Sequence, residues 1–133
     1  MKNKMTKKGF TLIELMVVIL IVGILAAASI PLMRGRIDSA KWAEGNAIAG
    51  TVKSAVRVYY AESGTILTGL ASTNGTTLGF STDDLTGTYF DAGDFTVAGT
   101  DATDITVTVT GGTFTASPSG SYQLEADGDW VKQ

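Results

Sequence analysis

The stretch of sequence that decides the fold is residues 9 to 33, which read GFTLIELMVVILIVGILAAASIPLM. It holds one charged side chain, the carboxylate of Glu14, and is then uncharged from Leu15 to Met33. About 20 apolar residues are enough for an α-helix that spans a bilayer. A charge at the centre of a bilayer costs roughly 2.5 to 3.5 kcal/mol on insertion scales, so an acid in such a segment usually marks a functional contact. Glu14 is therefore the first candidate site residue.

The segment in front of this stretch, residues 1 to 9, has four lysines and no acid. Basic residues beside an apolar span stay on the cytoplasmic side, so we predict a cytoplasmic leader. Two simpler readings stay open, a secretory signal cut after Ala28 and a plain uncleaved anchor. The first puts a costly carboxylate in its apolar core, and the second leaves Gly9, Phe10 and Glu14 unexplained.

The pattern predicts one long helix over residues 10 to 62, close to about 80 Å in length at 1.5 Å per residue. Residues 10–33 are apolar all round, and Pro31 is expected to kink or loosen the helix near residues 27 to 31. Residues 34–62 are amphipathic, with Asp38 and Lys41 spaced to pair and with Lys53 and Arg57 expected on a solvated face. The apolar positions at spacings of three and four are Ala40, Ala43, Ala47, Ile48, Val52, Ala55, Val56 and Tyr59.

The period changes after the helix. Gly64 is a natural helix stop, and residues 63–93, rich in Gly, Thr, Ser and Asp, are predicted to be an ordered connecting loop. Residues 94–133 alternate apolar and polar side chains, with turn signals at Gly111-Gly112 and Asp127-Gly128. The expected strand residues are Phe95, Val97, Ile105, Val107, Val109, Phe114, Tyr122 and Leu124. We predict an α+β fold, in which an antiparallel sheet of three or four strands packs its Ile105, Val107 and Val109 face on the helix.

Composition excludes several function classes. The chain has no cysteine and no histidine, which excludes thiol and Ser-His catalysis and the usual zinc sites. Asp83 and Asp84 lie together in a loop with no general-acid partner, so a glycosidase-like site is not supported. Four of the ten basic residues are in the leader, which leaves six against thirteen acids and a net charge of −7 in residues 10–133. We therefore expect neither an enzyme nor a nucleic-acid partner.

The residues Lys8-Gly9-Phe10-Thr11-Leu12-Ile13-Glu14-Leu15, with the apolar stretch to Pro31, resemble the class III signal of type IV pilins and their relatives. The resemblance is close over residues 1–35 and loose as far as Tyr60. It implies the pilin fold, with residues 1–9 as a leader that a prepilin peptidase removes by cutting between Gly9 and Phe10. It also implies methylation of the new amino terminus at Phe10. The absence of cysteine departs from the many pilins whose carboxy-terminal loop a disulfide closes.

The resemblance further implies a role for Glu14, which in this family neutralises the amino terminus of a neighbouring subunit. The function it implies is a major structural subunit that polymerises as a homo-oligomeric helical filament. Such a subunit starts in the inner membrane, is driven by an inner-membrane platform and a cytoplasmic ATPase, and ends in a pilus on the bacterial surface. Adhesion, motility, DNA uptake and secretion all use this helix and are set by the head and by partner genes.

Two alternative functions stay open, a major pseudopilin of a type II secretion system and a monomeric membrane-anchored binding module. Replacing Glu14 by Ala separates the module, which should tolerate it, from a filament subunit.

Weaker candidates complete the sequence reading. Gly23 lies four residues before Ala27, a spacing that lets membrane helices approach closely, so Gly23 and Pro31 are candidate assembly residues. Carboxylates near the carboxy terminus could supply the oxygen ligands that calcium prefers, although acidic turns are more often simply solvated, and we expect no cofactor. These weak calcium candidates are Glu125, Asp127 and Asp129, with Asp101 and Asp104.

Overall fold

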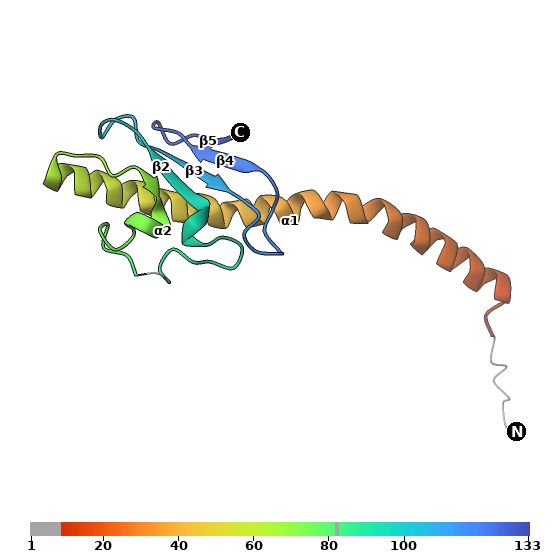
Figure 1. The fold of residues 1–133 in the computed structure, drawn as a ribbon. Helices are drawn as coiled ribbons and strands as arrows, with labels where there is room; N and C mark the ends of the chain where they lie inside the picture. Colours follow the sequence, from red (N-terminus) through yellow and green to blue (C-terminus); the bar gives the residue numbers. More distant parts are fainter. Residues whose placement is uncertain (1–8, 82) are drawn as a thin grey trace, which may run out of the picture. The chain divides into compact units, whose positions relative to one another are not determined.

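The computed structural model describes residues 9–81 and 83–133 of the chain (Figure 1). It divides into two compact units, Met1–Ile37 and Asp38–Gln133, and the boundary lies within a single helix. The leader predicted for residues 1–8 lies outside the described residues.

The long helix is present and is labelled α1, Leu12–Ser63, which confirms the helix predicted over residues 10 to 62. It runs without a break through Pro31, so the helical conformation survives the proline, and the predicted kink stays a prediction. Gly64 ends the helix with a φ of +70°, a conformation that favours glycine, and its N–H donates to the carbonyl of Tyr60 at 2.8 Å.

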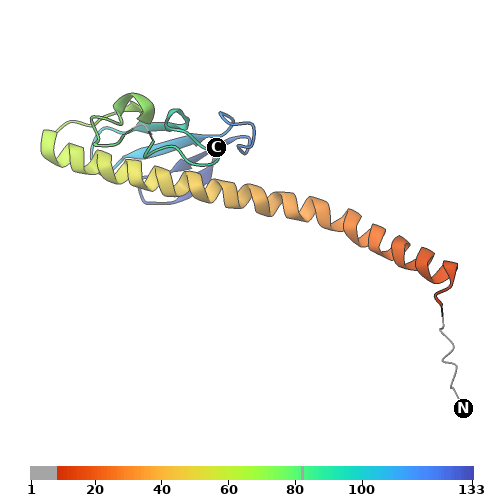
Figure 2. The same ribbon diagram turned by 90° about the horizontal axis from the view of Figure 1, so that it is seen from below.

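The second unit places an antiparallel sheet against the carboxy-terminal half of α1, as Figures 1 and 2 show. Its strands follow one another in chain order: β1, Gly69–Leu70; β2, Phe95–Ala98; β3, Thr106–Thr110; β4, Ser121–Leu124; and β5, Trp130–Lys132. The α+β class is confirmed, but five strands form where three or four were expected. A strand of two or three residues is too short to show a period of two, which is why β1 escaped the sequence reading.

The core confirms the sheet face that was predicted. Ile105, Val107 and Val109 are fully buried, and Val107 and Val109 pair with Leu124 and Tyr122 across the β3–β4 ladder. They form one cluster with buried residues of α1 and of the connecting segment.

The helix face that packs on this core differs from the predicted stripe. The buried positions of α1 are Trp42, Gly45, Ala49, Val52 and Val56, together with Lys53. Ala40, Ala43 and Ala47 are exposed, so that part of the predicted stripe is wrong. Alanine is apolar enough to join a stripe on either face, whereas the bulk of Trp42 and the small size of Gly45 fix which face meets the sheet.

Gly45 gives a test of this packing. A Cβ there would lie 3.1 Å from the Phe90 ring and 3.3 Å from Val109, whereas a Cβ at Gly50 of the same helix would meet nothing within 4 Å. Overpacking costs about 1 to 3 kcal/mol, and glycine to alanine in a helix gains up to about 1 kcal/mol. We expect Gly45→Ala to lower the melting temperature and the control Gly50→Ala to raise it, measured by circular dichroism in detergent. Equal gains in both variants would contradict this packing.

Turns and loops were only partly predictable. The turn at Asp127-Gly128 is confirmed, since Gly128 N–H donates to the Glu125 carbonyl at 3.0 Å between β4 and β5. The tight turn predicted at Gly111-Gly112 is wrong: residues 111–120 form a longer loop, closed by a Gly111 N–H to Gly120 carbonyl bond of 2.9 Å. Phe114 lies in this loop and not in a strand. The connecting segment also holds short helices, α2 (Ala71–Asn74) and η1 (Ala92–Asp94).

Candidate functional site

The amino-terminal half of α1 presents apolar side chains on every side. From Phe10, which is 84% exposed, to Met33, which is 64% exposed, the large hydrophobic residues of this unit are exposed by about half or more. Among the described helices, α1 is long and apolar enough to cross a membrane. So large an apolar surface requires lipid or another protein to cover it.

Glu14 lies at the start of this surface and caps its own helix. Its Oε2 accepts hydrogen bonds from the backbone N–H and from the hydroxyl of Thr11, both at 2.8 Å, while the N–H of Glu14 donates to Thr11 Oγ1 at 3.3 Å. This reciprocal arrangement is a capping box, with Thr11 as the capping residue. The sequence reading missed it, although the Thr-x-x-Glu spacing was there to be found. Since these bonds use Oε2, they leave Oε1 available for a second partner.

The predicted processing site precedes the helix. Gly9 and Phe10 have no regular secondary structure, both residues are exposed, and a Cβ on Gly9 would meet nothing within 4 Å. As far as the described residues go, the peptide bond between them is therefore sterically open to another protein.

The two remaining assembly candidates lie within the apolar half of α1. Gly23 has nothing within 4 Å of the Cβ position, which leaves room for the close approach of another helix. Two turns along, Ser29 Oγ donates to the carbonyl of Leu25 at 2.8 Å and so satisfies its hydroxyl within the helix. Pro31 follows, with Ile30 and Leu32 as its neighbours in the sequence.

In the second unit, charged side chains of α1 bind loops of the head, by which we mean the sheet and loops of residues 64–133. Lys53 is only 5% exposed, so the prediction that it lies on a solvated face is wrong. Its ammonium group donates to the carbonyl of Glu125 and, at 3.1 Å, to that of Ala126, to which Arg57 also donates at 3.4 Å. Burial lowers the pKa of Lys53, and the nearby Arg57 charge lowers it further. The charge of this buried lysine thus reaches the β4–β5 turn.

Two further contacts repeat this arrangement along the helix. Lys41 donates to the carbonyl of Ala116 at 2.8 Å, lies 5.2 Å from the centre of the Tyr89 ring, and pairs with Asp38 at 4.0 Å as predicted. Glu44 Oε1 accepts from the backbone N–H of Tyr89 at 2.8 Å. Charge-assisted bonds to loop backbone thus tie the head to α1 in a chain that has no cysteine.

The acidic residues proposed as weak calcium ligands fall into two turns. Glu125, Asp127 and Asp129 lie in the β4–β5 turn, where Lys53 already occupies two of the carbonyl oxygens. Asp101 and Asp104 lie in the β2–β3 turn and accept from threonine and backbone groups. Among the residues the structure describes, no group of three acidic side chains is arranged to hold a metal ion.

The β2–β3 turn predicts an acid dependence. Hydrogen bonds from Thr103 to Asp101, and from backbone and Thr100 to Asp104, lower the pKa of both carboxyls. A carboxyl whose pKa is lower folded than unfolded stabilises the fold above its unfolded pKa and loses this as pH falls. We expect Asp104→Asn to flatten the loss of thermal stability below about pH 4. The same loss of thermal stability in Asp104→Asn and in the parent below this pH would contradict the prediction.

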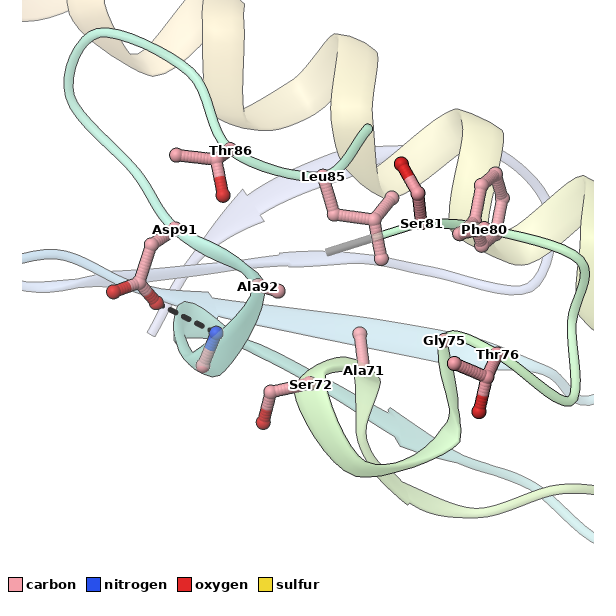
Figure 3. A pocket seen from close by; sticks show the side chains of 11 residues that line it. Ala71, Ser72, Gly75, Thr76, Phe80, Ser81, Leu85, Thr86, Asp91 and Ala92 are labelled. Carbon is pink, nitrogen blue, oxygen red and sulfur yellow. Dashed lines mark hydrogen bonds between the residues drawn. The ribbon is translucent and has the colours of Figure 1, made fainter. Parts of the chain in front are cut away.

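A pocket of about 360 Å³ lies between α2, η1 and the connecting segment (Figure 3). Its floor includes Ala71 and Leu85, both buried, and its rim carries hydroxyl groups and Asp91, whose carboxylate accepts from Gly93 N–H at 2.6 Å. Neither histidine nor cysteine occurs in the chain, so the rim offers no pair of nucleophile and imidazole base.

Comparison with known proteins finds a matching family model and several similar proteins. Residues 4–30 match the model of the prokaryotic N-terminal methylation motif. The fimbrial protein EcpC of Eikenella corrodens is 46% identical over 61 residues, which are 46% of this chain and 40% of that protein. The type IV major pilin protein PilE1 of Neisseria gonorrhoeae is 50% identical over 58 residues, 44% of this chain and 35% of that protein.

A third relative, the type IV major fimbrial protein FimA of Dichelobacter nodosus, is 50% identical over 50 residues, 38% of this chain and 31% of that protein. The chain thus spans 40% or less of the length of these relatives. No solved structure matches the chain.

Proposed function

We propose that this protein is a major structural subunit of a surface filament. Its amino-terminal motif and helix are those of the type IV pilin family. The observation that carries the proposal is the exposed apolar half of α1, which lies largely within the matched methylation motif and has Glu14 in its first turn. Lipid would cover this surface while the subunit is in the membrane, and copies of the same subunit would cover it in the filament. Contacts between copies that do not close into a ring give a filament.

Processing would come first. A prepilin peptidase would cut between Gly9 and Phe10 and the amino group of Phe10 would be methylated, which is what a match to a methylation motif supports. The exposed, irregular backbone there would admit a peptidase. Because the chain has no phosphate-binding loop, a separate ATPase and an inner-membrane platform would drive extraction.

Assembly would then pair charges in an apolar setting. Cleavage leaves a cationic amine on Phe10, and an unpaired charge is expensive where water is excluded. Glu14 could neutralise the amine of a neighbouring copy through Oε1 while Oε2 stays bonded to Thr11. The pair would therefore set the register of one copy on the next.

A periplasmic pseudopilin is the second candidate, because it would use the same helix and the same cleavage. The named relatives, which are fimbrial and major pilin proteins, favour the surface filament.

Mass spectrometry tests the proposal. Protein sheared from the cell surface should begin at methylated Phe10, and protein left in the membrane should include the same species. A Phe10 start confined to the membrane would favour the pseudopilin, and a start at Met1 or Ser29 would overturn the filament reading.

A further inference from the structure

The charge of this chain is divided unevenly. Residues 38–133 hold twelve of the thirteen acids, all except Glu14, against four basic residues, which gives a net charge of −8. The four basic residues are Lys41, Lys53, Arg57 and Lys132. The charged side chains of residues 10–37 are Glu14, Arg34 and Arg36, so the arginines follow directly on the apolar stretch that ends at Met33.

The sheet gathers negative charge at one of its ends. In an antiparallel sheet taken in chain order, the turns at residues 99–105 and 125–129 lie at one end and the loop at residues 111–120 lies at the other (Figure 1). The first end, which we call the acidic end, carries Asp101, Asp104, Glu125, Asp127 and Asp129. The loop at residues 111–120 carries no charged residue.

The contacts of α1 order these two ends along the helix. Lys41 binds the uncharged loop through Ala116, and Lys53, twelve residues further on, binds the acidic end through Glu125 and Ala126. The acidic end thus lies toward the carboxy terminus of α1. Lys53 and Arg57 offset part of its charge, but neither contacts Asp101, Asp104 or Asp129 in the described residues.

Arg34 and Arg36 are exposed and precede Lys41 on the same helix. Within the part of the chain that the structure describes, the ion pair is that of Lys41 with Asp38, and neither arginine takes part in one. In the sequence of α1, the two arginines therefore come first, then Lys41, which binds the uncharged loop, and then Lys53, which binds the acidic end.

We propose that Arg34 and Arg36 of one copy bind the acidic end of a second copy. This inference rests on the proposed function, because copies stacked with parallel helices in the same direction bring the amino-terminal side of one head to the carboxy-terminal side of the next. Opposite charges then meet wherever one copy contacts the next. If one copy is reversed or displaced along the stack, like charges meet instead. The contact is heterologous and does not close, as a filament requires.

A charge exchange tests the pairing. Arg34→Glu with Arg36→Glu, and separately Asp127→Lys with Asp129→Lys, should each lower the yield of sheared filaments about tenfold or more, since like charges across an interface are repelled. All four substitutions in one chain should restore the yield to within about threefold of the parent, because the attraction is re-formed with its sign reversed. Failure of the combined variant to recover, or normal assembly by either pair alone, would overturn the proposal. If the arginine variant is lost from the membrane fraction and the combined variant does not restore it, the arginines bind lipid phosphates. That result would also overturn the proposal.

Disulfide trapping gives a second, structural readout. The chain has no cysteine, so a single engineered pair reports one contact without background. Arg36→Cys with Asp129→Cys should give a ladder of crosslinked multimers in filaments under mild oxidation. The matched control, Arg36→Cys with Ser119→Cys in the exposed uncharged loop, should remain monomeric. Filaments that give no ladder at Asp129 overturn the pairing and leave the filament function standing, whereas the absence of any filament from the parent chain overturns the function itself.

Discussion

Replacing Glu14 by Ala is expected to leave the protein in the membrane at the parental level and to reduce filaments at least about a hundredfold. The reason is the amine that cleavage creates on Phe10: one partner removed from a buried ion pair costs about 3 to 5 kcal/mol, and each 1.4 kcal/mol is a factor of ten. The measurement is the amount of subunit in sheared filaments relative to the membrane fraction, read by immunoblot. Parental filament yield from the Ala variant would contradict the assembly role and favour a monomeric membrane-anchored module.

Two variants separate this role from helix capping, which the structure shows Glu14 also performs. Glu14→Gln keeps an oxygen that can accept from Thr11 but removes the charge, so it should lose filaments nearly as severely as Ala. Thr11→Val removes the capping hydroxyl and keeps the charge, at a cost of about 1 kcal/mol, so its loss should stay below about tenfold. The reverse order of severity would show that Glu14 acts by starting the helix.

The helix and the main strands were predictable because their signals are local. An uncharged run of this length, a period of two at Val107 and Val109, and a glycine at position 64 each point to one structure without knowledge of the rest of the chain. The strand β1 was not predictable, because its two residues gain their conformation from pairing with Thr96 and Val97. A segment of two residues carries no sequence pattern from which pairing with a distant strand could be predicted.

The face of α1 was misread for a related reason. Ala40, Ala43 and Ala47 have the right spacing for a core stripe, but small side chains contribute little apolar area and do not decide which side of a helix is buried. Trp42 decides it instead, since its ring meets Phe90 at 5.2 Å and Tyr122 at 4.6 Å between ring centroids. Bulk, and the partners that surround it, outweigh the count of apolar positions.

At the candidate site, the sequence predicted roles for Gly9, Phe10 and Glu14, which stay predictions, and it did not predict the bonds that Glu14 makes. The Thr-x-x-Glu spacing is a local signal, so the capping box could have been predicted. Lys53 could not have been, because lysine is usually exposed and its partners are backbone carbonyls, which are the same in every sequence. Only the fold brings the β4–β5 turn to the helix.

Lys53→Ala is expected to destabilise the head by about 3 kcal/mol. It empties a position that is 5% exposed and also removes the charged donor of two carbonyl groups, each such hydrogen bond being worth about 1.5 to 3 kcal/mol before desolvation of the ammonium is counted. For a head of this size, the melting temperature should fall by more than about 10 °C, measured by circular dichroism in detergent.

Lys53→Met separates the two contributions, because it keeps an apolar stem of similar length and loses only the charge and the donors. Burial lowers the pKa of Lys53, so the ammonium is held against a cost that Met does not carry. We expect Met to recover about half of the loss seen with Ala, and Lys132→Met, on the exposed β5 strand, to change the melting temperature by less than about 3 °C. If Lys53→Met is as stable as the parent, packing of the stem alone holds the carboxy-terminal hairpin. If it is as unstable as Lys53→Ala, the bonds from the ammonium to Glu125 and Ala126 replace the covalent closure that a cysteine-free head lacks.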